Sequence, residues 1–239
     1  MRASLITLIV VIVVAAAAIL GIVSAMPREA VHDYLAPIPA PTVVAQPDAA
    51  PTPDAAPVVD PHWLAQTSAR TGVPEFALSA YASADLVIDA SDPACNLGWN
   101  TLAALGTIES ANGTVNGGSL VDNGDAVPVI VGPTLDGSPY AAVADTDDGA
   151  FDGDTVWDRA VGPLQFLPAT WAEYGADANG DGIANPNNIF DASLGAGLYL
   201  CATAGDVSNA SSWSAAIRAY NPNDTYLSRV RDLAISYAG

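Results

Sequence analysis

Apolar residues recur at helical spacing through most of the chain after residue 60, and turn residues divide them into short segments. The stretch PHWLAQTSARTGVP has Asp60 as an N-cap and Pro61 in the first turn, and Gly72 and Pro74 end it. We take Asp191 as the cap of the helix that follows it. Ser211 or Ser212 is the cap expected for the next one. The predicted helices cover 61–72, 74–87, 98–110, 167–175, 192–205, 213–220 and 224–237.

The helical pattern stops between Gly113 and Gly162, where Gly, Asp and Pro dominate. One short strand-like run, VPVIVG at 127–132, lies inside this segment. Long irregular segments in compact domains are usually functional or disordered, so we interpret this one as a functional insertion. The predicted fold class is mainly α, with a small β or irregular insertion, in a domain that spans 61–239.

A separate apolar segment opens the chain. Residues 3–27 contain no charged side chain, and residues 5–23 are nearly all Leu, Ile, Val and Ala. About 20 such residues span a bilayer as a helix. We predict a membrane anchor in 1–26; a cleaved signal peptide is the alternative, because VSA at 23–25 resembles a cleavage site. Both place the rest of the chain outside the cytoplasm, in the cell envelope or secreted.

Residues 27–60 have the composition of a linker. They hold eight of the eighteen prolines, in phrases such as PIPAP, together with Ala, Asp, Val and Thr. Such a composition gives an extended, semi-rigid spacer that builds no hydrophobic core. The linker would hold the domain away from the membrane in which the N-terminal helix is anchored.

The charge balance excludes one class of partner. The chain has 26 Asp+Glu against 7 Lys+Arg, a formal net charge of -19. A surface of this sign repels nucleic acid, so we expect no nucleic-acid partner.

The two cysteines, Cys95 and Cys201, fit an exported domain. An even pair in an oxidising compartment most often forms a disulfide. A metal pair or a catalytic thiol has no support, since the sequence has no CxxC and both histidines lie far from either cysteine. His62 is expected at the surface of the first helix.

One glutamate occupies an unusual position. Leu102, Leu105, Ile108 and Glu109 stand at i, i+3, i+6 and i+7 of a predicted helix, so Glu109 shares the buried face. Desolvation raises the pKa of a carboxyl group and favours its protonated form near neutrality. A general acid in glycosidic bond cleavage needs this property. The alternative is a buried glutamate satisfied by hydrogen bonds.

Two further segments form an ordered set with IES at 108–110. They are GPLQFLPATW at 162–171 and AYN at 219–221. With these motifs the chain resembles the lytic transglycosylases of bacterial cell walls, in particular the membrane-bound lytic transglycosylase B type, over roughly residues 63–237. The resemblance implies a lysozyme-like, mainly helical fold with a cleft for peptidoglycan glycan strands.

The resemblance also implies a role for each matching residue. Glu109 matches the catalytic acid/base, and Ser110 matches the hydroxyl residue that orients it. Gln165 matches the cleft glutamine that contacts substrate. Tyr220 and Asn221 match the pair that lines the site near the acid. Without the family pattern, ordinary capping or packing would account for the last four residues.

A single carboxylate suffices for the implied reaction. An ordinary glycosidase needs two, whereas a lytic transglycosylase uses a hydroxyl of the substrate. Glu109 would protonate the glycosidic oxygen between N-acetylmuramic acid and N-acetylglucosamine, and then accept the proton of the muramoyl C6 hydroxyl as that oxygen attacks C1. The product carries a 1,6-anhydromuramoyl end, and the chemistry requires no cofactor.

Two other functions stay open from the sequence. A lysozyme-like muramidase would hydrolyse the same bond, with a water positioned by Asp145 or Asp154. A non-catalytic wall-binding module would bind the same glycan strands, although such a module has no need of a buried acid.

A second motif has the spacing of a cation-binding loop. In DANGDGIANPNNIFD, residues 177–191, oxygen-bearing side chains fall at positions 1, 3 and 5 of an EF-hand loop, with Gly182 at the turn. The resembling family uses a fifteen-residue version closed by an aspartate. Ca²⁺ or Na⁺ is the candidate structural ion, and an ordinary Asp/Asn/Gly turn is the alternative. The candidate ligands are the side chains of Asp177, Asn179, Asp181 and Asp191 and the carbonyl of Ile183.

A third segment, DTDDGAFDGDTVWD at 145–158, is denser in aspartate. This segment could form a second cation site or border the cleft. A solvated run of Asp-Gly turns is the ordinary one, and we favour it.

Overall fold

The computed structural model describes residues 57–239. The predicted membrane segment 1–26, and the predicted linker up to residue 56, lie outside the described residues. About half of the described residues are in α-helices and the strands are few and short, which confirms a mainly α class. In this part of the chain no helix is both long and apolar enough to cross a membrane.

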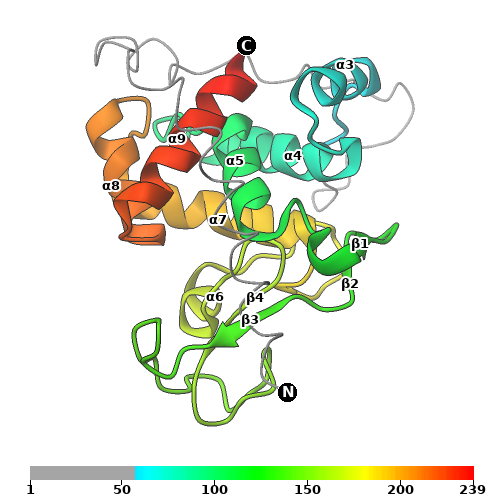
Figure 1. Cartoon of the computed structure of the whole chain (residues 1–239). Coiled ribbons are helices and arrows are strands. Elements are labelled where there is room, and N and C mark those ends of the chain that lie inside the picture. Colours follow the sequence, from blue (N-terminus) through cyan, green and yellow to red (C-terminus); the bar gives the residue numbers. More distant parts are fainter. Residues whose placement is uncertain (1–56) are drawn as a thin grey trace, which may run out of the picture.

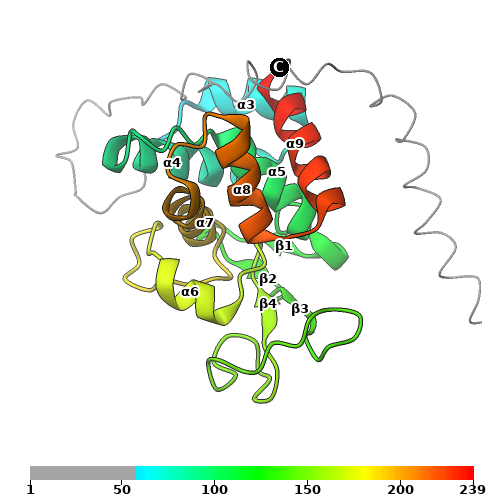
Figure 2. The same cartoon turned by 90° about the vertical axis from the view of Figure 1, so that its left-hand side faces the viewer.

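Most of the helices gather in one part of the molecule, and α6 and the strands of the insertion lie in the other (Figure 1). Helix α7 lies between the two parts in both side views (Figures 1 and 2). The helices are α3 (Pro61–Thr71), α4 (Glu75–Ser91), α5 (Trp99–Ser110), α6 (Pro168–Tyr174), α7 (Ile189–Ala204), α8 (Ala210–Tyr220) and α9 (Asp224–Ala238), with a 3-10 turn η1 (Val115–Gly117).

The first helix follows its local signals. Asp60 caps α3 by accepting the N–H of His62 at 2.8 Å, and the helix ends at Gly72, which is left-handed with φ 75°. His62 is exposed, as predicted. Helix α4 extends to Ser91, beyond the predicted end at residue 87, because the buried side chain of Ile88 carries the apolar face one turn further.

Helix α7 begins earlier than predicted, so Asp191 is not its N-cap. The cap is Asn188, whose side chain accepts the N–H of Phe190 at 3.0 Å, and Asp191 lies in the first turn. Asparagine and aspartate cap helices about equally well. The sequence alone therefore leaves the choice between them open.

The predicted caps of α8 are wrong for the same reason. Asn209, not Ser211 or Ser212, precedes the helix, and its side chain accepts the N–H of Ser212 at 2.9 Å. The upstream asparagine starts the helix at Ala210 and makes it longer than the predicted 213–220.

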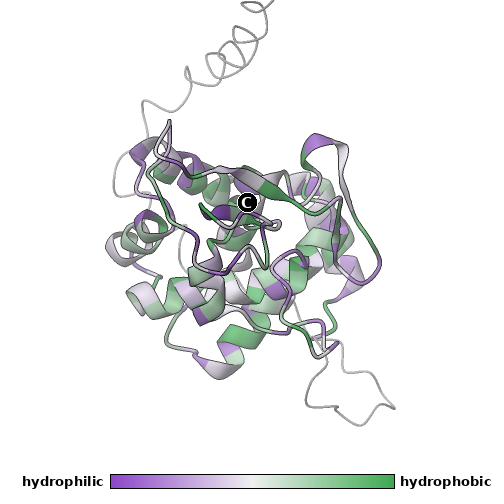
Figure 3. Ribbon diagram, turned by 90° about the horizontal axis from the view of Figure 1, so that it is seen from below, coloured by the Kyte–Doolittle hydropathy of each residue, from purple (hydrophilic) through white to green (hydrophobic). Residues whose placement is uncertain are grey.

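The apolar run 127–132 does not form one strand. Strand β2 (Ala126–Val127) pairs with β1 (Ser119–Leu120), whereas β3 (Val131–Thr134) pairs with β4 (Arg159–Val161), both antiparallel. Pro128 separates the two strands, because it has no N–H to donate to a ladder. Seen from the side of the insertion, hydrophilic and hydrophobic segments are interspersed along its loops (Figure 3).

The hydrophobic core lies between α4, α5 and α7. Tyr81, Leu105 and Leu200 are each at most 1% exposed and bring one side chain from each of these helices into it. Cys95 and Cys201 form the predicted disulfide, which joins the α4–α5 connection to α7. This core fixes the C-terminal end of α5, where Glu109 lies.

Candidate active site

Glu109 lies in the last turn of α5 and is half-buried. Burial raises the pKa of its carboxyl to about 7 from an ordinary value of 4.5, while the hydrogen bond from Tyr226 and the charge of Arg229 oppose the rise. A carboxyl group with this pKa is partly protonated at neutral pH, so it can donate a proton and take one back. The predicted effect of burial on this residue is therefore present.

The hydroxyl of Tyr226 donates a hydrogen bond to Glu109 Oε1, across 117 residues of sequence. Tyr226 lies in the first turn of α9 and is 8% exposed. Burial and the neighbouring carboxylate raise the pKa of its hydroxyl well above the ordinary value. The hydroxyl therefore stays protonated at neutral pH and acts as a donor that orients the carboxylate.

Ser110 follows Glu109 but does not touch its carboxylate. The serine is 1% exposed, and its Oγ donates to the carbonyl of Pro163 at 2.7 Å and accepts the N–H of Gly113 at 2.8 Å. These bonds fix the turn after α5 to the GPLQ segment, residues 162–165. Ser110 thus fixes the backbone that carries Glu109, and its hydroxyl is engaged in these two bonds.

The GPLQ segment is a tight turn whose glycine is required by packing. Gly162 has φ +76°, and a Cβ at this position would overlap the carbonyl oxygen of Pro186. Gln165 is also left-handed, with φ 52°, and its Nε2 donates to the carbonyl of Gly162 at 3.0 Å. The Gln165 side chain is half-buried, and no hydrogen bond reaches its Oε1 from the described residues. This oxygen is free to accept a bond from a ligand.

Tyr220, the last residue of α8, binds the same turn from its other side. Its hydroxyl donates to the carbonyl of Leu164 at 2.6 Å, and its ring packs on Phe166 with centroids 6.1 Å apart. Burial, followed by the charge of Glu109, raises the pKa of Tyr220 well above the ordinary value. Tyr220 is thus close enough to Glu109 to sense its charge.

Asn221, the last residue of the AYN segment, makes no side-chain hydrogen bond to the GPLQ turn or to Glu109 among the described residues. It ends α8, and its Oδ1 accepts the N–H of Asn223 at 3.1 Å in the connection to α9. That bond shapes the turn which delivers Tyr226 to Glu109. The structure therefore brings together Glu109, Ser110, Gln165 and Tyr220, and places Asn221 in the supporting turn.

Sequence reasoning missed Tyr226 and Arg229. Both lie on α9, five and eight residues after Asn221, and neither belongs to a motif used above. A signal was available in retrospect, since α9 follows the AYN segment directly and must pack near it. The one-turn spacing of Tyr226 and Arg229 puts both on one side of that helix.

The candidate cation loop is closed by its own hydrogen bonds. Asp177 accepts the N–H groups of Gly180 at 2.8 Å and Gly182 at 2.7 Å. The Asp191 carboxylate is fully buried and closes the base of the loop. Its oxygens accept the N–H groups of Ala178, Asn179 and Asn185 at 2.8, 3.2 and 2.9 Å.

The candidate ligands suit a hard cation by type but not by arrangement. Within residues 57–239, the carboxylates of Asp177, Asp181 and Asp191 do not form a group whose oxygens all lie within 4.8 Å of one another. Asn179 directs its amide nitrogen, not its oxygen, at Asp181 Oδ2, 3.0 Å away. Ile183, whose carbonyl is the fifth candidate ligand, is 65% exposed. The geometry fits an Asp/Asn/Gly turn, and calcium binding stays a prediction from the sequence.

A melting experiment tests the ion. A ligand that binds only the folded state at a hundredfold excess over its Kd adds about 2.7 kcal/mol of stability. If Ca²⁺ occupies the loop, the melting temperature rises with Ca²⁺ and falls back with chelator in the wild type but not in Asp181→Asn. An equal melting temperature under both conditions rejects the site.

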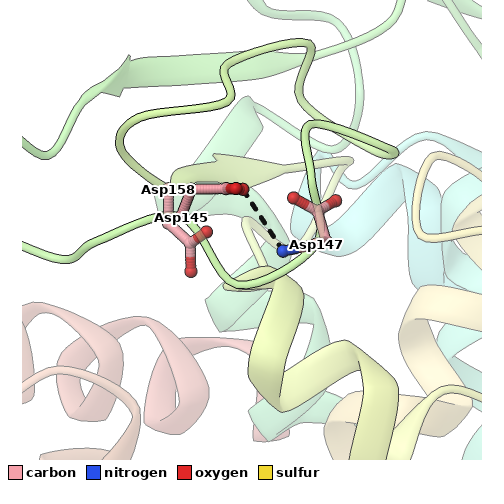
Figure 4. A group of neighbouring side chains, drawn as sticks. All are labelled: Asp145, Asp147 and Asp158. Atoms are coloured by element: carbon pink, nitrogen blue, oxygen red, sulfur yellow. Dashed lines mark hydrogen bonds between the residues drawn. The ribbon is translucent and has the colours of Figure 1, made fainter.

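The aspartate-rich segment 145–158 does form a compact acidic group. The carboxylates of Asp145, Asp147 and Asp158 come within 4.8 Å of one another (Figure 4). Asp158 is fully buried, and its two oxygens accept the N–H and the hydroxyl of Thr146, both at 2.8 Å. Asp145 and Asp147 accept N–H groups of the same loop. These bonds are those of the predicted Asp-Gly turns.

Comparison of the chain with protein-family models, with curated proteins and with solved structures finds no match. One carboxyl group of raised pKa, oriented by a phenol, stands beside a turn with an unused amide oxygen. Such a site can transfer a proton to and from a bound substrate.

Proposed function

We propose that the chain is a lytic transglycosylase that cleaves peptidoglycan between N-acetylmuramic acid and N-acetylglucosamine, on a lysozyme-like fold. One observation carries the proposal. Ser110 and Tyr220, from two motifs separated widely in sequence, bind the consecutive carbonyls of Pro163 and Leu164 in the third motif. The GPLQ segment is thus hydrogen-bonded to both other segments that suggest the family, next to Glu109. Unrelated surface motifs would not be expected to contact one another in this way.

Glu109 would act alone in both proton transfers. It would protonate the leaving glycosidic oxygen and then, as carboxylate, take the proton from the muramoyl C6 hydroxyl that attacks C1. A pKa of about 7 suits both steps at neutral pH, because the protonated acid and the carboxylate are then both well populated. Gln165 Oε1 is the acceptor that the turn offers to a hydroxyl or acetamido group of the glycan.

Hydrolysis by a muramidase would need a second carboxylate to activate water. The two candidates are engaged in their own loop. Asp145 Oδ1 accepts the N–H groups of Asp147 and Gly149. Asp154 binds Arg159 at 3.2 Å and caps the turn that follows it. This engagement favours transglycosylation over hydrolysis.

The location we propose is the cell envelope, where peptidoglycan is found, with the chain anchored or secreted through its N-terminal segment. The disulfide between Cys95 and Cys201 supports an oxidising compartment. The net charge of -19 supports the absence of a nucleic-acid partner.

Product analysis tests the proposed reaction. Purified peptidoglycan is incubated with the full chain, and the released muropeptides are weighed by mass spectrometry. Anhydro ends are about 18 Da lighter than hydrolysed ends, the mass of the water that a hydrolase adds. Products with free reducing ends would replace the proposal by a muramidase. Binding without any product would replace it by a wall-binding module.

Tyr226→Phe is expected to reduce kcat/KM about 10-fold, the effect of one hydrogen bond to a charged group. The pH profile should change as well. In the wild type, activity falls as pH rises through about 7, where Glu109 loses its acidic proton. We call this fall the alkaline limb of the pH profile. The Tyr226 hydroxyl lowers the pKa of Glu109, so its removal moves the alkaline limb to higher pH.

The matched control for this variant is Tyr237→Phe on the same helix. The Tyr237 hydroxyl bonds to Thr107 at 3.0 Å and not to Glu109. Its loss should leave the alkaline limb in place. A limb that moves equally in both variants, or in neither, would contradict the role of Tyr226.

A further inference from the structure

Arg229 is exposed on α9 beside the candidate acid and has no carboxylate partner among the described residues. The other arginines in this part of the chain are all engaged. Their partners are the Tyr237 carbonyl for Arg70, Asp154 for Arg159, Asp224 for Arg218 and Asp232 for Arg231. In a chain with 26 acidic residues and 7 basic ones, Arg229 is the one arginine of the described residues that neither a carboxylate nor a carbonyl engages.

The position of Arg229 places its charge at the site. It lies one helical turn after Tyr226, on the same side of α9, and Tyr226 donates to Glu109. The positive charge of Arg229 acts on both the Glu109 carboxyl and the Tyr226 hydroxyl. Because Coulomb interactions weaken with distance and with solvent screening, a charge that acts on both groups lies near them.

Tuning of the acid does not explain this arginine. A general acid gains from a raised pKa, and Arg229 lowers the pKa of Glu109. Its positive charge opposes the rise that burial produces, so raising the pKa of the acid is not the role of Arg229. The charge is better explained by a negative group that arrives with the substrate.

We infer that Arg229 is the recognition residue for a carboxylate carried by the glycan next to the bond that is cleaved. This inference rests on the proposed function and deepens it. A guanidinium group binds a carboxylate through two parallel hydrogen bonds, which gives orientation as well as attraction. It would also offset, at the point of entry, the repulsion between a chain of net charge -19 and an anionic polymer.

Peptidoglycan offers this chemistry from two sources. The lactyl group of a muramic acid without a peptide ends in a free carboxylate. Where a peptide stem is attached, the lactyl group is an amide, and the carboxylates belong to the stem. Three substrates distinguish the sources: intact peptidoglycan, strands stripped of their stems by an amidase, and stripped strands whose lactyl carboxylates have been converted to amides.

The test compares Arg229→Gln with the wild type, as full chains, on the three substrates. The ratio of kcat/KM, variant over wild type, should fall about 10- to 100-fold on a substrate that presents the recognised carboxylate, as for a lost charge-assisted bond. It should stay near one on the amidated strands. A fall on intact material alone identifies the stem, and a fall on stripped strands alone identifies the lactyl group.

Two further variants sharpen the result. Arg231→Gln makes the same change two residues along α9, at an arginine already paired with Asp232, and should change none of the ratios. Arg229→Lys keeps the charge without the two-pronged geometry and should recover only part of the loss. Ratios that fall equally on all three substrates, or on none, would overturn the inference and leave the proposed function untouched.

Failure of the proposed function would look different. In that case the wild type releases no product from any of the three substrates. Binding of the three substrates to the wild type and to Arg229→Gln then decides the question by itself. Weaker binding of intact peptidoglycan or of stripped strands, but not of amidated strands, to the variant supports carboxylate recognition, and identical binding of all three substrates by both proteins overturns it.

Discussion

Glu109→Gln is expected to lower kcat/KM on peptidoglycan by about 1,000-fold, within the range that a positioned general acid contributes. Glutamine has nearly the same shape, and its amide oxygen still accepts the hydrogen bond from Tyr226. It has no acidic proton to give to the glycosidic oxygen, and it takes none from the C6 hydroxyl. Both proton transfers fail together, so no anhydro ends should form.

Thermal melting at two pH values separates a catalytic role from a structural one. The folded-state pKa of Glu109 is about 7, against an ordinary 4.5, so between these values the unfolded chain binds fewer protons than the folded one. The contribution of Glu109 to stability therefore falls as pH rises. Above pH 7 the buried carboxylate is ionised and destabilises the folded state by its full amount. Glutamine does not ionise. The variant should melt at a higher temperature relative to the wild type at pH 8 than at pH 4.

Glu75→Gln is the matched control. Glu75 is exposed in the first turn of α4 and contributes nothing to the site, so its replacement should leave kcat/KM unchanged. If Glu109→Gln instead unfolds the domain at pH 4, the glutamate is a structural residue. If the variant folds and still produces anhydro ends at the wild-type rate, another group is the acid.

The helices could be predicted where local chemistry was unambiguous. Asp60 and Gly72 bound α3 as the sequence indicates, because a capping aspartate and a left-handed glycine act within one turn. The starts of α7 and α8 could not be predicted, since more than one residue of similar capping ability stands within three positions of each start. Only tertiary contacts decide: Asp191 is occupied with the N–H groups of the loop before it.

The candidate site was predictable only in part. The position of Glu109 on an apolar helix face anticipates its raised pKa, because such a face packs against the core and the carboxyl group is desolvated with it. The contact with Tyr226 was not predictable from the sequence, because it spans 117 residues and depends on how α9 packs against α5. The same holds for Ser110, whose hydroxyl turns to Pro163 instead of to the carboxylate.

The double variant Cys95→Ala/Cys201→Ala is expected to lose about 3–5 kcal/mol of unfolding free energy. The disulfide closes a loop with a sequence separation of 106, which contains α5, the whole insertion and most of α7. Opening so long a loop gives the unfolded chain much additional conformational freedom. For a domain of this size, at about 2–4 °C per kcal/mol, the melting temperature should fall by roughly 6–20 °C.

Reductant provides the control for the disulfide, since a reduced wild type should melt near the double variant and the variant should not respond. Both cysteines are buried, so alanine fits without displacing neighbours, and the folded site should keep its shape. We therefore expect kcat/KM at 25 °C to stay within about twofold of the wild type, because stability and catalysis act through different residues here. An unchanged melting temperature would contradict the stabilising role. A large loss of activity in the folded variant would show that the bridge also positions Glu109, through the packing of α5 against α7.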